Sequence, residues 1–220
     1  MAMLIFRVFS AFLSYPTADM RTALPAMAEI VRSSPHLPAE QRDSLLALVD
    51  DLAQGDLLEA EERYSDLFDR GRALSLHLFE HLHGDSRDRG SAMVELKQLY
   101  ETAGFGLSSS ELPDYLPVVL EYLSCRDIVE AREMLADCAH ILKVIARALI
   151  ARQSDYAAVL QSLLVIAGEQ PVDAAKIPPA KERADSIDRE WREEPAFAGD
   201  PVADATANIK PVPGGRHVVE

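Results

Sequence analysis

The amino-acid sequence predicts an all-α protein, a single-domain bundle of many helices followed by a poorly ordered C-terminal tail. Hydrophobic residues make up 48% of the 220 residues, while there are only 10 glycines. Leu, Ala, Glu and Arg dominate, a mixture that favours helix over strand. Apolar residues also recur at spacings of three and four, the period of a helix face. This period stops at Gly168, so we expect a helical domain over residues 1–168 and a flexible tail over residues 169–220.

Three helices are expected in the N-terminal part of the chain. The first ends at Tyr15-Pro16, because a residue before proline avoids the α region. Either Thr17 or Asp19 can cap the second helix. Pro38 stands at the start of the third helix, where its missing N–H costs no hydrogen bond. These helices are expected over residues 4–14, 17–33 and 38–55.

The central part of the chain contains two strongly apolar segments. On the first, Tyr64, Leu67 and Phe68 share one helix face. The segment around His77 is apolar nearly all round, which is typical of a helix in the middle of a bundle. Whether Gly71 separates these two helices or lies within one is left open by the pattern. The expected elements are a helix over residues 56–68, a helix around His77, a charged loop over 84–90 and a helix over 92–103.

In the C-terminal part, Ser108 and Glu111 have the spacing of a capping box. Pro113 falls in the first turn, and the regular helix is expected to begin or bend at Pro117 because proline lacks the N–H that a helix interior needs. Apolar residues then step by threes and fours from Ile128 to Leu149, which predicts one long helix. A last core helix is expected over residues 154–167.

The tail has a different composition from the rest of the chain. Seven of the 13 prolines lie between Pro171 and Pro213, and the apolar residues are isolated. Such a segment cannot bury enough apolar surface to fold on its own. One short helix is expected within it, over residues 181–192.

Charge and apolar patterning limit the partners and the location. A formal net charge of −14 argues against nucleic acid, which needs a basic surface, and favours a cationic peptide. The apolar N-terminal segment contains Arg7 and lacks a cleavage site, and no later stretch is long enough to span a bilayer. We therefore expect a cytoplasmic protein without stable membrane insertion. Cys125 and Cys138 are expected to be small buried residues.

The segment His77-Leu78-Phe79-Glu80-His81 offers one enzymatic hypothesis. It has the His-x-x-Glu-His pattern of inverted zinc peptidases. On a helix, the two imidazoles could hold zinc while the carboxylate of Glu80 activates water. The alternative is that Glu80 and His81 form a hydrogen-bonded pair that fixes helix packing. No downstream third ligand stands out, so the zinc peptidase remains the second hypothesis.

Tyr64 and Phe68 also have two interpretations. They are either core residues or the wall of a groove in which the apolar face of a partner helix lies. In the second case, Asp69 and Asp114 supply negative charge for basic residues of the partner.

The run from Tyr64 to Gly90 resembles the NarJ family, the assembly chaperones of respiratory nitrate reductase. The resemblance rests on Phe68-Asp69-Arg70-Gly71-Arg72 and on Phe79-Glu80-His81-Leu82-His83-Gly84, and it extends from about Phe9 to Gly168. It implies an all-helical chaperone without a bound cofactor or hydrolytic activity. Such a chaperone binds the N-terminal segment of the apo catalytic subunit, keeps it competent for molybdenum cofactor insertion and delays its docking to the membrane subunits.

The same resemblance implies the binding residues. An aromatic-x-x-Leu-Phe motif of the relatives matches Tyr64, Leu67 and Phe68, and their Pro-Asp-His motif matches Pro113 and Asp114. Tyr115 stands where the relatives have histidine, so stacking and hydrogen bonding remain there but titration near neutral pH does not. The expected partners are the apo catalytic subunit and, beyond it, molybdenum cofactor delivery proteins. The full expected peptide-binding set is Tyr64, Leu67, Phe68, Asp69, His81, Pro113, Asp114 and Tyr115.

Overall fold

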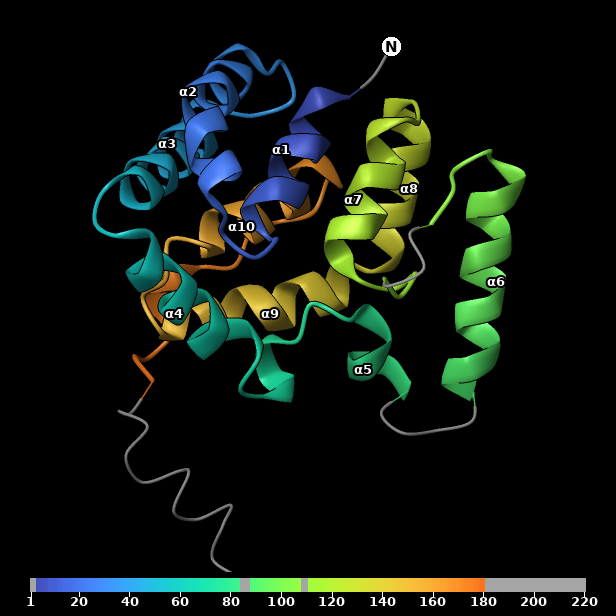
Figure 1. Cartoon of the computed structure of the whole chain (residues 1–220). Coiled ribbons are helices and arrows are strands. Elements are labelled where there is room, and N and C mark those ends of the chain that lie inside the picture. The colour runs from blue at the N-terminus through green and yellow to red at the C-terminus, as the bar shows by residue number, and fades with distance from the viewer. Residues whose placement is uncertain (1–2, 84–87, 108–110, 181–220) are drawn as a thin grey trace, which may run out of the picture. The chain divides into compact units, whose positions relative to one another are not determined.

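The computed structural model describes residues 3–83, 88–107 and 111–180, and this part of the chain is an all-α bundle, as predicted. It holds ten α-helices and two short 3₁₀ helices, with no strand beyond one isolated β-bridge (Figure 1). The elements are α1 (Leu4–Phe12), α2 (Ala18–Ser33), α3 (Ala39–Ala53), α4 (Leu57–Phe68), η1 (Arg72–Leu74), α5 (Leu78–His83), α6 (Asp88–Thr102), α7 (Leu116–Ser124), α8 (Ile128–Asp137), α9 (Ala139–Ala151), α10 (Ala157–Ile166) and η2 (Ala174–Lys176).

Helix α1 is one of the central elements of the core. Phe6, Phe9 and Phe12 on this helix are completely buried. Figure 1 shows α1 lying beside α7, and the backbone N–H of Met3 donates a hydrogen bond of 2.7 Å to the carbonyl of Ser124 at the end of α7. The apolar period in the sequence therefore marks the side of α1 that faces the bundle.

Helices α2 and α3 form a hairpin in which α2 packs against α1 and α3 packs against α10. Thr17, rather than Asp19, caps α2, because its side chain accepts a hydrogen bond of 3.1 Å from the backbone N–H of Met20. Arg21 on α2 donates hydrogen bonds to the carbonyls of Ala53 and Gly55 at the end of α3. These side-chain bonds satisfy carbonyls that the helix end leaves unpaired.

Gly71 separates α4 from the following elements, which decides the question left open by the sequence. Its backbone is extended, with φ of 171°. The chain then forms η1 and enters α5 only at Leu78. His77 therefore lies outside the helix in which the sequence pattern placed it.

Helix α6 begins at Asp88, so the last three residues of the expected loop 84–90 are helical; residues 84–87 lie outside the described part of the chain. Gly104 ends this region in the left-handed conformation, with φ of 74°, which glycine adopts without strain. Figure 1 shows α6 at the edge of the bundle. Ser108 of the expected capping box also lies outside the described part of the chain.

Helix α7 begins at Leu116, so Pro117 stands in its first turn, as predicted. Pro113 precedes the helix, so the expectation that it falls in the first turn is wrong. The prediction of one long helix from Ile128 to Leu149 is wrong. Cys138 has φ of −98° and ψ of 7°, and it divides the segment into α8 and α9. The apolar spacing continues across the break, so periodicity alone does not detect the change of direction.

The two cysteines have different surroundings. Cys138 is half-buried, and burial raises the pKa of its thiol to about 12. Cys125 is exposed, so the expectation that both are buried is wrong for this residue. It directly follows α7, where its backbone N–H caps the helix end.

The compact unit extends to Ala180, beyond the expected boundary at Gly168. The side-chain amide of Gln161 on α10 binds the backbone of Val172 with two hydrogen bonds of 2.7 and 2.8 Å. The ammonium group of Lys143 lies 2.7 Å from the carboxylate of Glu169. Residues 169–180 are therefore held against the core by specific polar contacts. The short helix expected over residues 181–192 lies outside the described residues.

Candidate functional site

Asp114 is completely buried between α5 and the start of α7. Its carboxylate accepts a hydrogen bond of 3.1 Å from the backbone N–H of Phe79 and lies 3.2 Å from Nδ1 of His77. Its own carbonyl accepts a hydrogen bond of 3.0 Å from the backbone N–H of Leu78. Asp114 therefore caps α5 from a distant part of the chain and satisfies N–H groups that the helix start leaves unpaired.

Two basic side chains compensate the buried carboxylate of Asp114. The hydrogen bond with Asp114 raises the pKa of His77 above its ordinary value of 6.5, against the opposing effect of burial. A guanidinium nitrogen of Arg89 lies 3.9 Å from the carboxylate of Asp114 and 3.3 Å from that of Glu80. A buried charge is stable only with such partners. The expectation that Asp114 offers its charge to a partner protein is therefore corrected, because the side chain is inside the protein and already paired.

Tyr115 packs against His77 at the surface of this region. The two residues form the isolated antiparallel bridge, and the centres of their rings lie 5.1 Å apart at an interplanar angle of 31°. The next backbone N–H, that of Leu116, donates a hydrogen bond of 2.8 Å to the carbonyl of Leu76. Tyr115 is half-buried. The ring of Tyr115 thus packs at a tilt against the ring of His77.

The hydroxyl of Tyr64 joins α4 to two other parts of the chain. It donates a hydrogen bond of 2.8 Å to the carbonyl of Leu13 and lies 3.1 Å from the hydroxyl of Tyr115. Because a hydroxyl has only one proton, Tyr115 is the donor in the second bond. Burial raises the pKa of both hydroxyls, so both remain protonated at neutral pH.

Tyr64 belongs to an aromatic cluster with Tyr15, Phe68 and Tyr156. The ring centres of Tyr64 and Phe68 lie 4.8 Å apart, and Phe68 meets Tyr156 edge-on at 5.3 Å. Tyr64 and Phe68 are only 4% and 8% exposed, so the core interpretation holds for these two side chains. Tyr15, by contrast, is 48% exposed and packs edge-on against Tyr64 with the ring centres 5.6 Å apart.

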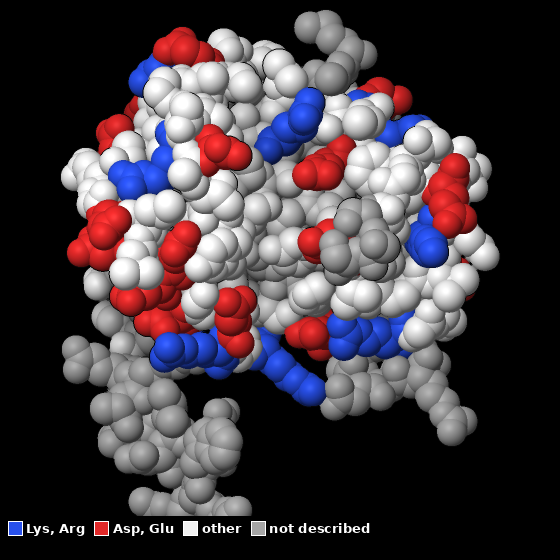
Figure 2. Space-filling view, viewed as in Figure 1, with Lys and Arg blue, Asp and Glu red and all other residues white. Residues whose placement is uncertain are grey.

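Tyr15 is the surface residue of the cluster that the sequence analysis missed. Partial burial, followed by the negative charges of Glu61 and Asp69, raises the pKa of Tyr15. Neither carboxylate forms an ion pair within the part of the chain that the structure describes. Figure 2 shows acidic side chains gathered over α4, at the lower left of this face. Tyr15 thus presents an aromatic ring beside two carboxylates that have no basic partner.

The remaining expected site residues lie in different surroundings. Leu67 is half-buried and lines a cavity of ≈410 Å³ together with Arg63 and Tyr156. His81 is half-buried, with Nε2 2.9 Å from the carbonyl of Ser75. Pro113 is buried, and its carbonyl accepts a hydrogen bond of 2.9 Å from the hydroxyl of Tyr100.

The expected peptide-binding set therefore divides into two groups. One group is buried and holds the fold together. The other group reaches the surface and remains available to a partner. The buried residues are Tyr64, Phe68, Pro113 and Asp114, and the residues with exposed or half-buried side chains are Leu67, Asp69, His81 and Tyr115.

The geometry of the His-x-x-Glu-His segment differs from that of a zinc peptidase. His77 precedes α5, so the three side chains do not share one helix. The ring of His77 binds Asp114, the ring of His81 binds the carbonyl of Ser75, and Glu80 pairs with Arg89. The expected Glu80–His81 pair is thus replaced by separate partners. Within residues 3–83, 88–107 and 111–180, no group of three or more His, Cys, Asp or Glu side chains is placed to hold a metal ion.

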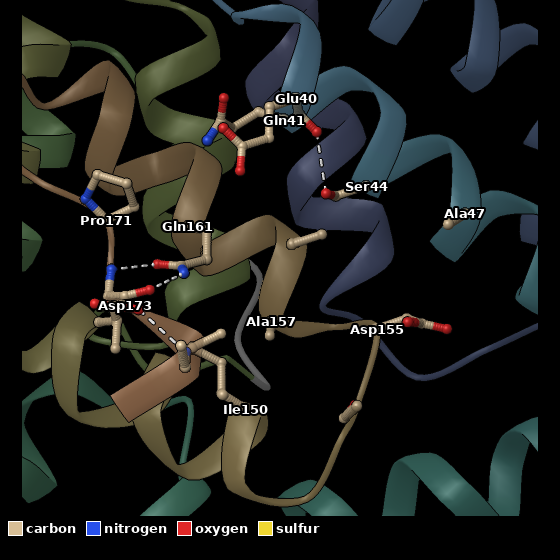
Figure 3. A pocket seen from close by; sticks show the side chains of 15 residues that line it. Glu40, Gln41, Ser44, Ala47, Ile150, Asp155, Ala157, Gln161, Pro171 and Asp173 are labelled. Atoms are coloured by element: carbon tan, nitrogen blue, oxygen red, sulfur yellow. Dashed lines mark hydrogen bonds between the residues drawn. The ribbon is translucent and has the colours of Figure 1, made fainter. Parts of the chain in front are cut away.

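A cavity of ≈670 Å³ with a mixed polar and apolar lining lies on another part of the bundle, between α3, α10 and residues 171–175 (Figure 3). The dashed lines from Gln161 in Figure 3 mark its two hydrogen bonds with the backbone of Val172. None of the expected site residues lines this cavity. Gln161, which lines this cavity, thus holds the segment after α10 in place.

Comparison with known proteins identifies the family. The sequence pattern of the nitrate reductase delta subunit family matches residues 34–161, more than half of the chain. The chain belongs to this family. It is 43% identical over 195 residues to the nitrate reductase molybdenum cofactor assembly chaperone NarJ of Escherichia coli K12, covering 85% of this chain and 81% of that protein. A second relative is the probable nitrate reductase molybdenum cofactor assembly chaperone NarW of Escherichia coli K12. The two sequences are 36% identical over 198 residues, which cover 87% of this chain and 82% of NarW.

Among solved structures, a proposed redox enzyme maturation protein from Archaeoglobus fulgidus has a similar fold. The TM-score is 0.52 at 22% sequence identity, and the match covers 72% of this chain and 88% of that one. The two relatives from Escherichia coli are named as assembly chaperones, so the comparisons do not support the zinc peptidase hypothesis.

No helix in the described part of the chain has both the length and the apolar character that crossing a bilayer requires.

Proposed function

We propose that this protein is a chaperone that binds the N-terminal segment of the apo catalytic subunit of respiratory nitrate reductase. It keeps that subunit competent for molybdenum cofactor insertion and delays its docking to the membrane subunits until assembly is complete. The observation that carries this proposal is the 43% identity over 195 residues to the E. coli assembly chaperone NarJ. The protein acts in the cytoplasm by binding alone, without catalysis and without a cofactor of its own.

The client surface in this proposal consists of Tyr15, Asp69, His77 and Tyr115, with Glu61 at its edge. Tyr15 and Asp69 are exposed, and His77 and Tyr115 are half-buried. Tyr64 connects them, because it packs against Tyr15 and hydrogen-bonds to Tyr115. Exposed aromatic rings on a rigid base are common binding anchors, since little conformational entropy is lost when they are covered. Leu67 and His81 lie at the periphery and contribute less.

The charge of this surface favours a basic client segment. The carboxylates of Glu61 and Asp69 have no basic partner among the described residues, and the whole chain carries a net charge of −14. A lysine or arginine of the client would lie over the ring of Tyr15 and pair with these carboxylates. Molybdenum cofactor delivery proteins are proposed as further partners that act on the chaperone–client complex.

Calorimetric titration with a synthetic peptide of the client's N-terminal segment tests the proposal. Tyr15→Ala removes the exposed aromatic anchor, and an anchor of this kind contributes about 2 kcal/mol, which corresponds to about thirtyfold in affinity. Asp69→Asn should weaken binding less, and its effect should shrink at high salt because exposed charges are screened within about 10 Å at 0.1 M.

Two matched controls accompany these variants. Val129→Ala removes an exposed apolar side chain on α8, and Asp43→Asn removes an exposed carboxylate on α3. Both should bind the peptide like the unmodified protein. Equal affinity of Tyr15→Ala and the unmodified protein would show that the client surface lies elsewhere, and failure of the peptide to bind at all would contradict the proposed function.

A further inference from the structure

The cavity between α3, α10 and residues 171–175 lies apart from the client surface (Figure 3). None of the residues assigned to the client surface lines it. Its volume of ≈670 Å³ lies within the range of cavities that bind small molecules. Its walls come from separate segments of the chain, so a ligand inside it contacts α3, α10 and the segment after α10 together.

Acidic side chains contribute to all of these walls. Glu40 belongs to α3, Asp155 precedes α10, and Asp173 belongs to the segment after α10. Neither Glu40 nor Asp155 forms an ion pair with another described residue. Asp173 lies 2.9 Å from the ammonium group of the exposed Lys176. Because no Lys, Arg or His of the described residues lines the cavity, its electrostatic potential favours a cation.

Gln41 on α3 adds an unpaired polar group to the lining. The residue is 9% exposed, and its carboxamide has no hydrogen-bond partner in the described part of the chain. The other carboxamide of the cavity, that of Gln161, forms two hydrogen bonds with the backbone of Val172. A buried polar group without a partner is costly unless a ligand or water binds it. The carboxamide oxygen of Gln41 can accept a hydrogen bond from an N–H group of a ligand.

The spacing of these groups indicates the kind of cation. The acidic side chains are not grouped closely enough to share a metal ion, because no three His, Cys, Asp or Glu side chains of the described chain are placed to hold one. The rest of the lining is mainly apolar and includes Ile150, Ala158 and Pro171. A matching ligand therefore has separated positive charges joined by apolar links. Linear polyamines have this structure, with ammonium groups that donate hydrogen bonds and methylene chains that pack on apolar surface.

We propose that this cavity binds a linear aliphatic polyamine. The ammonium groups of the polyamine lie near the carboxylates of Glu40 and Asp155 and the carboxamide oxygen of Gln41, and its methylene chains cover the apolar lining. The bound polyamine connects α3 to the segment after α10 and stabilises the folded protein, because it binds the folded state only. This site is independent of the client surface and of the proposed function.

Calorimetric titration of the full chain with spermidine at about 0.1 M salt tests the proposal. Gln41→Leu is the decisive variant, because it removes the acceptor while it keeps the net charge and the approximate size of the side chain. The carboxamide has no protein partner, so leucine should leave the fold stable. We expect the affinity for spermidine to fall about tenfold, as for the loss of a hydrogen bond to a charged group.

A second variant, Glu40→Gln combined with Asp155→Asn, measures the contribution of the carboxylates. The matched control is Glu133→Gln combined with Asp43→Asn, which changes the net charge equally at exposed positions outside the cavity. Affinity should fall about fivefold or more for the first pair and change less than about twofold for the control. Equal affinities of the two double variants would indicate diffuse attraction to a protein with a net charge of −14, and would overturn the proposal.

Thermal unfolding provides an independent readout. Spermidine should raise the Tm of the unmodified protein more than that of Gln41→Leu. The proposal is also overturned if the unmodified protein does not bind spermidine, or if Gln41→Leu folds and binds it with unchanged affinity. Circular dichroism of each variant checks the fold. If Gln41→Leu does not fold, the two double variants still decide, because all their substitutions are at exposed positions.

Discussion

The hydroxyl of Tyr64 donates a hydrogen bond of 2.8 Å to the backbone carbonyl of Leu13, 51 residues earlier in the chain. This bond ties α4 to the end of α1. The same hydroxyl accepts a hydrogen bond from Tyr115, which directly precedes α7. Since Tyr15 follows Leu13 by two residues, the position of the exposed ring depends on the buried tyrosine beneath it.

Tyr64→Phe should destabilise the protein without changing the aromatic packing. The substitution leaves the buried carbonyl of Leu13 without its donor, and an unsatisfied buried group costs about 1–3 kcal/mol. Urea denaturation monitored by circular dichroism measures this loss. Tyr15→Phe is the control, because the Tyr15 side chain is half-exposed and water can replace its hydrogen bonds. Equal stability of Tyr64→Phe and the unmodified protein would contradict the structural role of the hydroxyl.

Asp114→Asn should also destabilise the fold, because asparagine keeps the shape but removes the charge that faces His77 and Arg89. Hydrogen bonds to charged groups contribute about 1.5–3 kcal/mol each to stability. The free energy of unfolding from denaturant titration is the readout. Asp43→Asn, at an exposed position, should change it by less than about 0.5 kcal/mol. A loss of peptide binding by Asp114→Asn without any loss of stability would instead indicate direct contact with the client.

The raised pKa of His77 predicts a pH dependence of stability. The pKa in the folded protein lies above the ordinary value of 6.5, because of the hydrogen bond with Asp114. The stabilising contribution is therefore fully present below about pH 6.5 and is lost as the pH rises through the folded pKa. Glu80 also favours the charged imidazole, and Arg89 opposes it.

His77→Gln provides the comparison for this pH effect. The difference in the free energy of unfolding between the unmodified protein and this variant should be larger at about pH 6 than at about pH 9. In an Asp114→Asn background, the difference should become nearly independent of pH. If this difference in the free energy of unfolding instead grows with pH, protonation of His77 does not stabilise the folded protein, and the prediction is wrong.

Two truncations should separate the segment after α10 from the rest of the tail. Deletion of residues 169–220 removes the Lys143–Glu169 ion pair and both hydrogen bonds between Gln161 and Val172. We expect this deletion to lower the free energy of unfolding by about 1–3 kcal/mol. Deletion of residues 181–220 alone should change it by less than about 0.5 kcal/mol, because that proline-rich sequence has no apolar period. A large loss from the shorter deletion would mean that the residues around Trp191 bind to the core.

The His77-x-x-Glu80-His81 segment should not bind zinc stoichiometrically. Its two imidazoles and its carboxylate already have different protein partners. Elemental analysis of protein purified without an affinity tag measures the metal content. About one zinc per chain, absent from a His81→Ala variant, would revive the peptidase hypothesis.

Local features of the fold were predictable from residues close together in the chain. The apolar spacing on residues 4–14 predicted α1 and its buried face, and Pro117 marked the start of α7. The expected end of the helical domain at Gly168 was less accurate, because the compact unit extends to Ala180. Gln161 lies on the core helix α10, but the segment around Val172 has no apolar period, so no local pattern indicates that residues 169–180 bind to the core.

The candidate site was predictable only in part, for a related reason. The aromatic spacing of Tyr64 and Phe68 identified an important helix face, but spacing does not tell whether a face meets solvent or another helix. The sequence suggested that the carboxylate of Asp114 could pair with a basic residue of a partner, but the side chain is buried beside α5. Tyr15 has no motif around it, and its role depends on Tyr64 at a distance of 49 positions in the chain.

By itself, the sequence determined the helical class, most helix boundaries, the acidic character and the family resemblance, because these depend on local propensity, composition and short motifs. Only the tertiary structure decided which aromatic residues reach the surface, where the chain turns at Cys138 and which groups pair with the buried Asp114. Burial and pairing are properties of residues that are distant in the chain and close in space. Burial and pairing are established only when the helices pack, so they cannot be read from any single segment of the sequence.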